Sequence, residues 1–467
     1  MPIVSLMETR FQLVTYMNTS PRYIAMRILL KVEEEGGYSN LALSHEMRNA
    51  SFSELDKGFL TELVYGVIER KMTLDYFIAR FSSVPIRKMN RYVLVILRIA
   101  TYQLAYLDKV PSYSVCDEAV KIAKKVIPVN AGFINAVLRA MSQAKLVIPA
   151  YSKKLFHQYN RYLSVKHSMP EWLIARWLTV FGQPFVEALF ESSHRHATFE
   201  LRANTTKITC DALRALLEEN GYEVQKSLIA KDGLRIANPA GIIQTKAFQQ
   251  GLFYVQDAAA SLVSHVLNPT KNSRILDACS APGGKATHLA ELMEDAGEVI
   301  ACDVFPHKLG LINENLMRLS LNSVHPTLQD STIRNATYDS AFDAVLLDVP
   351  CTGLGLLGRK PEIRWAREEQ DFASLHRVQN DLLHTCAEYV KPGGTLVYST
   401  CSIDPSENQE RIHAFLSAHK AFSLCDFDAL LPEQLRNRGG QDGMLTLYPQ
   451  IDDCDGFFIS KMRRVSS

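Results

Sequence analysis

The sequence predicts a protein of three parts: an all-α helical bundle, a small α+β module and an α/β Rossmann-like domain. Its 467 residues exceed what one ordinary hydrophobic core accommodates, so about three domains are expected. Apolar residues recur at helical spacing in the first third, and strand-like apolar runs alternate with helical stretches from Gly251 onward. The apolar fraction of 47% and the charged fraction of 22% are typical of folded globular chains.

The helical bundle is predicted to begin at Ser20, with Pro21 at the first helical position, and to end near Leu146. Its apolar residues recur at intervals of three and four, which places them on one face of each helix. We expect these faces to form the core of the bundle. They are Ile24, Ile28, Leu29 and Val32; Leu60, Leu63, Val64 and Val67; Val93, Ile96, Leu97 and Ala100; Val115, Ala119, Ile122 and Ala123; and Phe133, Ala136 and Val137.

A polar, Pro-containing stretch at 149–170 is expected to link the bundle to the second module. In that module, alternation at 199–204 predicts a strand, 210–219 a helix, and 222–236 further strands. We therefore place the three domains at residues 19–148, 165–250 and 251–467.

The third domain shows the alternation that is typical of a doubly wound sheet. In such sheets ligands bind beyond the carboxyl ends of the strands, so functional residues are expected directly after each strand. The runs that predict strands are 274–277, 298–302, 342–347, 395–398 and 456–461, with a weakly marked strand before Asp330.

Charge and cysteine usage narrow the class of protein. Residues 1–150 carry 19 basic and 13 acidic side chains, an excess that suits phosphate contacts but also occurs on ordinary surfaces. The nine cysteines form no C-x-x-C pair, so we expect reduced thiols and no metal. Glu8 and Arg10 interrupt the first twenty residues, and no stretch approaches the roughly 18 apolar residues of a membrane span. We expect a cytoplasmic protein without membrane contact.

Two strand ends carry candidate cofactor residues. The first predicted strand runs into D-A-C-S-A-P-G-G-K at 277–285, whose glycines let the backbone approach a ligand closely. This spacing differs from G-x-G-x-x-G, which disfavours a nicotinamide or flavin site. Asp303 ends the second strand, where a carboxylate can accept hydrogen bonds from a cofactor ribose, although a helix cap is the ordinary alternative. Asp330, after the third strand, could reach an adenine.

The fourth and fifth strands lead to two cysteines. The fourth runs into Asp348 and Cys351, and the fifth runs into Cys401. Adjacent parallel strands deliver their ends to one rim, so these three side chains should converge on one pocket. A buried inert cysteine is the usual alternative, but two at strand ends beside a carboxylate favour a reactive pair. After Cys401, Ser406 and Gln409 have the spacing of a capping box, which predicts a helix start.

Three motifs resemble those of the RNA 5-methylcytosine methyltransferases, the Nop/NSUN/RsmB superfamily. They are A-P-G-G-K at 281–285, D-x-P-C-x-G-x-G at 348–355 and S-T-C-S at 399–402. Ser280 and Val349 stand where many members carry alanine. The helical front resembles the NusB-like RNA-binding domain, and the fusion is similar to the bacterial RsmB (Sun, Fmu) branch. The resemblance implies a class I methyltransferase fold for the third domain.

The resemblance implies S-adenosylmethionine as the cofactor and carbon 5 of one cytosine in 16S ribosomal RNA as the methylated atom. It implies that Cys401 is the nucleophile and that Cys351 assists product release, with Asp348 and Lys285 completing the catalytic set. We expect the enzyme to be a monomer. The residues implied to surround the cofactor are Cys279, Ser280, Ala281, Pro282, Gly283, Gly284, Lys285, Asp303, Asp330 and Asp348.

The chemistry independently requires two such groups. Carbon 5 of cytosine is a poor nucleophile until a thiolate adds to carbon 6, which explains a cysteine at position 401. The proton on carbon 5 must then leave before the thiolate can, and Cys351 is placed to take it directly or through a water. A base inside an RNA stem must be extruded to reach this pocket. Candidate RNA contacts of the bundle are Arg87, Lys88, Arg91, Lys121, Lys124 and Lys125, for which a solvated surface is the alternative.

Alternative functions stay open at the level of sequence. Relatives with the same motifs modify other ribosomal or transfer RNAs, and a non-catalytic RNA-binding assembly factor would need the bundle alone. Transfer to an exocyclic amine usually places an aromatic residue after a Pro-Pro pair, whereas this chain has Val349, Pro350 and Cys351 there. A nicotinamide oxidoreductase ranks last.

Overall fold

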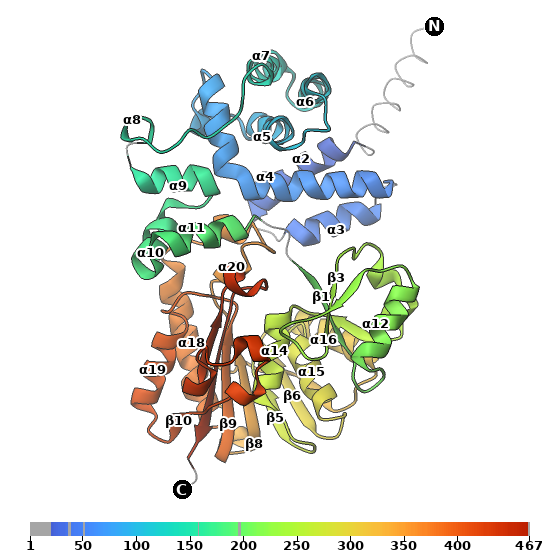
Figure 1. Cartoon of the computed structure of the whole chain (residues 1–467), viewed down its shortest axis with the longest axis vertical. Coiled ribbons are helices and arrows are strands. Elements are labelled where there is room, and N and C mark those ends of the chain that lie inside the picture. The colour runs from blue at the N-terminus through green and yellow to red at the C-terminus, as the bar shows by residue number, and fades with distance from the viewer. Residues whose placement is uncertain (1–19, 36–38, 50–51, 157, 195–197, 466–467) are drawn as a thin grey trace. The chain divides into compact units, whose positions relative to one another are not determined.

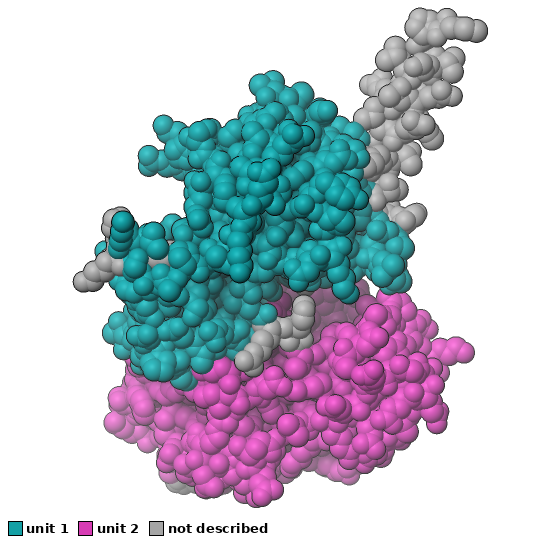
Figure 2. All heavy atoms as spheres, turned by 45° about the horizontal axis from the view of Figure 1, so that its top comes forward, with its two compact units in different colours: residues 1–194, 360–368 teal, residues 195–359, 369–467 magenta. Residues whose placement is uncertain are grey.

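The computed structural model describes residues 20–35, 39–49, 52–156, 158–194 and 198–465. The chain forms two compact units (Figure 2). The helical unit contains the described residues up to His194 together with Lys360–Glu368, and the α/β unit contains the other described residues.

Apolar faces at helical spacing form the core of the helical unit, as the sequence predicted. The 28-residue helix α4 begins after Ser53, whose side chain accepts a hydrogen bond from the amide of Asp56. Its residues Leu60, Leu63 and Val64 are fully buried. The helices of this part are α2 (Pro21–Glu35), α3 (Ser39–Asn49), α4 (Glu54–Phe81), α5 (Arg91–Tyr106), α6 (Ser112–Val126) and α7 (Ala131–Ser142), with the 3-10 turn η1 (Ile86–Lys88).

The predicted face of α7 is partly wrong. Ala136 is exposed and Phe133 is only half-buried, and Val32 of α2 is also half-buried. The buried face of α7 lies along Ala131, Ile134, Val137, Leu138 and Met141, because the helix begins at Ala131 and its wide apolar stripe offers more than one choice of centre.

The stretch at 149–170 is helical rather than an extended linker. Helices α8 (Lys153–Phe156) and α9 (Tyr159–His167) occupy it, followed by α10 (Glu171–Phe181) and α11 (Gln183–Ser192). Leu163 and Val165 of α9 are buried. The sequence prediction missed α9 because only two of its buried positions, Leu163 and Val165, are apolar, which gives too weak a periodicity.

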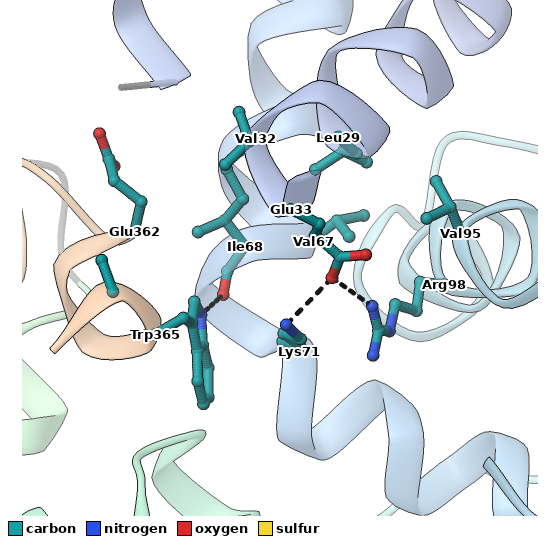
Figure 3. A pocket seen from close by; sticks show the side chains of 11 residues that line it. Leu29, Val32, Glu33, Val67, Ile68, Lys71, Val95, Arg98, Glu362 and Trp365 are labelled. Atoms are coloured by element: carbon teal, nitrogen blue, oxygen red, sulfur yellow. Dashed lines mark hydrogen bonds and ion pairs between the residues drawn. The ribbon is translucent and has the colours of Figure 1, made fainter. Parts of the chain in front are cut away.

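Residues 360–368 belong to the helical unit although they follow Cys351 by only a few positions. Their short helix α17 (Ile363–Ala366) carries Trp365, which donates a hydrogen bond from Nε1 to the Ile68 carbonyl at 2.7 Å. Trp365 also lines a pocket of about 160 Å³. In this pocket Glu33 accepts from Lys71 and Arg98 (Figure 3). The helical unit therefore holds a segment that is distant in sequence.

The α/β unit begins with a four-stranded antiparallel sheet in the order β2-β3-β1-β4. Helix α12 (Cys210–Glu219) buries Leu213 and Leu217 in the core of this small module, at the bounds that the sequence predicted. Its strands are β1 (Phe199–Ala203), β2 (Val224–Lys226), β3 (Gly233–Ile236) and β4 (Phe253–Val255).

An eight-stranded sheet forms the rest of the α/β unit, in the order β10-β12-β9-β8-β5-β6-β7 with β11 paired to β12 (Figure 1). Strands β5 to β9 are parallel, whereas β12 and its neighbours are antiparallel. The central strands are buried on both faces, and their continuous apolar runs made them predictable. The strands are β5 (Arg274–Asp277), β6 (Glu298–Asp303), β7 (Val324–Leu328), β8 (Phe342–Asp348), β9 (Val390–Thr400), β10 (Phe422–Leu424), β11 (Met444–Leu447) and β12 (Phe457–Arg464).

Helices join these strands as in a doubly wound fold. Their bounds are α14 (Ala258–Leu267), α15 (Gly284–Leu292), α16 (Pro306–Leu319), α18 (Asp371–Ala387) and α19 (Gln409–Ala418), and short helices α13 (Lys246–Gln249) and α20 (Pro449–Asp452) lie in loops. Among the described helices of the chain, none is long and apolar enough to span a membrane.

Candidate active site

Two cysteines meet at the carboxyl ends of β8 and β9. The strands are parallel neighbours with Asp348 opposite Ser399, so the loops that follow both strands leave the sheet at one rim. The Sγ atoms of Cys351 and Cys401 lie 3.3 Å apart. Cys351 is buried and Cys401 is partly exposed. The convergence that the sequence predicted for Asp348, Cys351 and Cys401 is therefore present.

The two thiols have different environments. The contact of Cys351 with Cys401, together with burial, raises the pKa of the Cys351 thiol well above its usual range. A thiol in this state carries its proton at neutral pH and is a weak nucleophile. Cys401 is the more accessible sulfur of the pair, which suits it for attack on a large substrate.

A half-buried ion pair lies beside the thiols. Lys285 Nζ is 2.7 Å from Asp348 Oδ2, and the hydroxyl of Ser399 donates to Asp348 Oδ1 at 2.8 Å. Burial lowers the pKa of Lys285, but Asp348 outweighs burial and holds it above the ordinary value. Cys401 also acts electrostatically on Lys285. The site therefore presents a fixed cation close to the accessible thiol.

The glycine-rich run is shaped by its neighbours in the sheet. The amide of Ser280 donates to the Cys302 carbonyl at 2.8 Å, and the amide of Gly283 donates to the Ser280 carbonyl at 2.7 Å. Gly283 has φ +98, a left-handed conformation that favours glycine at the start of α15. Cys279, Ala281 and Pro282 complete this turn between β5 and α15, and burial raises the pKa of the Cys279 thiol well above its usual range.

Asp277 is a polar group that the sequence interpretation did not assign to the site. It ends β5, is fully buried, and neither of its carboxylate oxygens has a hydrogen-bond partner. Burial raises the pKa of Asp277 to about 7. A buried carboxyl group without a partner at a strand end is unfavourable in the free protein, which indicates a binding site for a polar ligand. Its position directly before the glycine-rich run was the available signal.

The two other predicted carboxylates differ. Asp303 ends β6, is 8% exposed, and accepts a hydrogen bond from the amide of Phe305. Asp330 is exposed, and its Oδ1 accepts from the amide and hydroxyl of Thr332 in a local turn. Asp303 thus makes a local backbone hydrogen bond of the kind that the helix-capping alternative expects. Its carboxylate nevertheless lies at the carboxyl end of β6, where a cofactor ligand was expected.

Glu407 holds the loop that carries Cys351 in place. The capping-box prediction for the neighbouring residues is wrong. The fully buried carboxylate of Glu407 accepts from the amide of Thr352 at 2.8 Å and from Gln379 Nε2 at 3.1 Å. The hydroxyl of Ser406 instead contacts Asp404, and α19 begins at Gln409 without a side-chain cap. A local spacing rule could not reveal that Glu407 pairs with a loop 55 positions earlier.

Arg202 of the small module braces the glycine-rich run. Its Nη1 donates to the Gly284 carbonyl at 2.7 Å, and it contacts both oxygens of Glu291 at 2.9 Å. All three residues belong to the α/β unit. No local pattern could predict this pairing, because β1 and α15 are separated by about eighty residues.

The basic candidates of the helical unit are unequal. Arg87 and Lys88 are exposed on η1, and Lys124 is exposed on α6. Arg91 pairs with Glu34, and Lys121 pairs with Asp117 and Glu118. Arg87 and Lys88 are thus better placed for phosphate contacts than Lys121.

Family models match three consecutive parts of the chain. Residues 19–143 match the NusB family, 169–243 match the ferredoxin-like domain of RsmF/B-like methyltransferases, and 264–463 match the 16S rRNA methyltransferase RsmB/F. The chain is 37% identical over 452 residues to the probable ribosomal RNA small subunit methyltransferase B of Bacillus subtilis, covering 96% of this chain and 99% of that one. The chain belongs to the RsmB family of methyltransferases.

Other members and solved structures agree. The Proteus mirabilis ribosomal RNA small subunit methyltransferase B is 32% identical, with 90% of this chain and 96% of that one covered. The crystal structure of PH0851 superposes with a TM-score of 0.81 at 27% identity, covering 95% and 99% of the two chains. A methyltransferase homologue from Pyrococcus horikoshii has a TM-score of 0.58 at 28% identity, covering 68% and 100%. The predicted fold, a NusB-like bundle, a small α+β module and a Rossmann-like methyltransferase domain, is confirmed.

Proposed function

We propose that this RsmB-family enzyme methylates carbon 5 of one cytosine in 16S ribosomal RNA through a covalent bond between Cys401 and the base. The single observation that carries the proposal is the pair of sulfur atoms 3.3 Å apart at neighbouring strand ends, one accessible and one buried. The RNA substrate follows the names of the relatives in Bacillus subtilis and Proteus mirabilis. The proposed domains are residues 19–148, 165–250 and 251–467.

The site suits S-adenosylmethionine. Neither carboxylate oxygen of the buried Asp277 makes a well-formed hydrogen bond, although Ser280 and Cys279 lie nearby, and the cofactor's amino-acid ammonium is the kind of group that would satisfy it. Asp303 at the next strand end suits the ribose hydroxyl groups of the cofactor. We assign the run 279–285 and Asp348 to the same site. Asp330 is the weakest member of this set because its carboxylate accepts hydrogen bonds within a local turn. When bound, the cofactor supplies an electrophilic methyl group.

The reaction begins with the Cys401 thiolate adding to carbon 6 of cytosine. This addition pushes an electron pair toward carbon 5, which then becomes nucleophilic enough to take the methyl group. Lys285, whose pKa is held above its ordinary value by Asp348, supplies a positive charge near the attacking sulfur. Asp348, which anchors Lys285 and accepts from Ser399, is the carboxyl group placed to bind the base edge.

Release requires loss of the proton on carbon 5. A base takes that proton, the carbon–hydrogen electron pair restores the ring double bond, and the bond to Cys401 breaks. Cys351 is proposed to serve this step, directly or through a water. The contact that most raises its pKa is the one with Cys401, and this contact is lost once Cys401 is bonded to the base. Cys351 can then release its own proton to solvent more readily, and its thiolate form is the one that can accept the proton from carbon 5.

The decisive test is the chemical identity of the product nucleoside. The full-length enzyme is incubated with methyl-labelled S-adenosylmethionine and unmodified 16S RNA, and the RNA is digested to nucleosides and separated. We expect the label in 5-methylcytidine. Label in N4-methylcytidine would replace the proposal with amine transfer, and no labelled nucleoside with preserved RNA binding would favour an assembly factor.

A further inference from the structure

A second cluster of polar side chains lies outside the proposed methylation site. Asp232 precedes β3 in the small module, His265 lies in the last turn of α14, and His288 lies in the middle of α15. One ligand atom of each, a carboxylate oxygen or a ring nitrogen, lies within 4.8 Å of the others. All three residues belong to the α/β unit.

His288 is the feature that ordinary packing does not explain. Its side chain is fully buried, and neither ring nitrogen makes a hydrogen bond. Nε2 lies 2.7 Å from Asp232 Oδ2, yet the orientation of the ring does not make a hydrogen bond, and that oxygen also has no hydrogen-bond partner. Burying such groups without partners is costly, so a missing ligand between them would satisfy both.

We propose that Asp232, His265 and His288 bind a divalent transition-metal ion of the Zn²⁺ class. Two imidazole nitrogens and one carboxylate oxygen form a donor set that suits zinc, whereas calcium and magnesium favour oxygen ligands alone. Three protein ligands leave a fourth position for water, and the 11% exposure of the His265 side chain provides access.

The distances are compatible with binding after a small adjustment. His265 Nε2 is 2.8 Å and His288 Nε2 is 2.7 Å from the Asp232 oxygens. Ligand atoms around tetrahedral zinc lie about 3.3 Å apart, since each bond is about 2.0–2.1 Å. The side chains would therefore open by about half an ångström, which rotation about their side-chain bonds can supply.

Neighbouring charges do not block the site. Arg202 is the nearby cation that acts electrostatically on His288. Glu291, which lies one turn further along α15, forms an ion pair with Arg202 at 2.9 Å and so neutralises the charge of Arg202. The metal would fasten Asp232 of the small module to α14 and α15. Because α15 follows the glycine-rich run, the ion would add to the support that Arg202 already gives this run. The metal site requires neither the proposed cytosine chemistry nor the two cysteines.

Two other places among the residues that the structure describes could capture zinc and must be controlled. The Cys351–Cys401 pair is one, because two sulfur atoms 3.3 Å apart favour soft metal ions. The exposed pair His384 and His419 is the other. The test therefore uses the full-length Cys351→Ser/Cys401→Ser double variant as its background and His419→Gln as a matched histidine control.

The experiment measures zinc bound by this background after chelator treatment, using Zn²⁺ alone and counting metal by mass spectrometry. We expect one equivalent, an increase in melting temperature on zinc addition, and no change with His419→Gln. His288→Gln and His265→Gln should each weaken binding by more than the roughly 10–100-fold that follows loss of an outer partner of a metal ligand.

The two variants keep the test decisive if one of them misfolds, because His265 is partly exposed and its substitution disturbs the core least. Circular dichroism of the metal-free proteins checks that they fold. The proposal is overturned if the background binds no stoichiometric zinc, or if His265→Gln binds zinc as tightly as the background does. Failure of the methylation assay would leave this result untouched.

Discussion

Two buried polar groups, Arg98 of the helical unit and Asp277 of the α/β unit, differ in whether their charges are paired. In the helical unit Arg98 is buried and fully engaged, with Asp75 and Glu33 at 2.7 Å. In the α/β unit the end of β5 carries the unpartnered Asp277, and the ends of β8 and β9 carry two cysteines in contact. A buried charge with hydrogen-bond partners stabilises one packing arrangement. A buried polar group without partners indicates a site where a ligand binds or a reaction takes place. The comparison locates the chemistry at the strand ends.

Apart from the two cysteines, the largest effect is expected from Asp348→Asn. The amide keeps the shape but loses the charge that anchors Lys285, so turnover should fall by roughly 100-fold or more, the range of a lost acid–base or charge-stabilising group. Asp343→Asn, on the same strand, is the matched control, because Asp343 pairs with Lys391 near the surface. Turnover is measured with saturating RNA and cofactor. Equal losses in the two variants would mean that strand β8, and not the site, was disturbed.

A smaller effect is expected from Asp303→Ala. Loss of a charged hydrogen bond to the cofactor ribose should cost about 1.5–3 kcal/mol of binding free energy. Calorimetric titration of S-adenosylmethionine measures it, and Asp330→Ala serves as comparison because its carboxylate is exposed in a local turn. If Asp330→Ala loses more affinity than Asp303→Ala, the cofactor lies further along the sheet edge than proposed.

Asp277 and His167 should contribute to stability with opposite dependences on pH. Burial raises the pKa of Asp277 from 3.8 to about 7, so the folded chain keeps a proton that the unfolded chain releases, and this stability is lost as pH rises through that window. Burial lowers the pKa of His167 in the helical unit from 6.5 to about 4, so its contribution is lost as pH falls through that window.

The melting temperatures of two variants, compared with that of the parent at several pH values, measure these pH dependences of stability. Relative to the parent, Asp277→Asn should gain in melting temperature as pH rises toward 7, and His167→Gln should gain as pH falls from 6.5 toward 4. A constant difference across pH for either variant would mean that the group is not held in the protonation state argued above.

The smallest effect is expected in the helical unit. Removing Arg87 and Lys88 together by alanine substitution should weaken 16S RNA binding and reduce the salt dependence by about one phosphate contact per residue. Lys121→Ala is the control, because Asp117 and Glu118 already occupy its amine. Affinities are compared at several salt concentrations. A larger loss in Lys121→Ala would move the RNA path to α6.

The sequence was most informative where one local rule decides the structure. Apolar runs placed the central strands, and the parallel arrangement brought Asp348, Cys351 and Cys401 together as expected. It was least informative where partners are distant: Glu407 lies between the two residues that were wrongly predicted to form a helix cap and binds the Cys351 loop, and Arg202 supports Gly284 from another module. The expectation of no metal considered cysteines, and could not anticipate that Asp232, His265 and His288 would meet.

The central claim is that Cys401 forms the bond to the base and Cys351 allows it to break. Each cysteine is changed to alanine, and the protein is incubated with RNA and methyl-labelled S-adenosylmethionine and separated on a denaturing gel. Cys351→Ala should give a slow, labelled band that nuclease removes, because methyl transfer proceeds and release stalls. Cys401→Ala should give neither band nor product. A slow band in Cys401→Ala and none in Cys351→Ala would reverse the two roles, and full activity of both variants without any band would contradict the covalent mechanism.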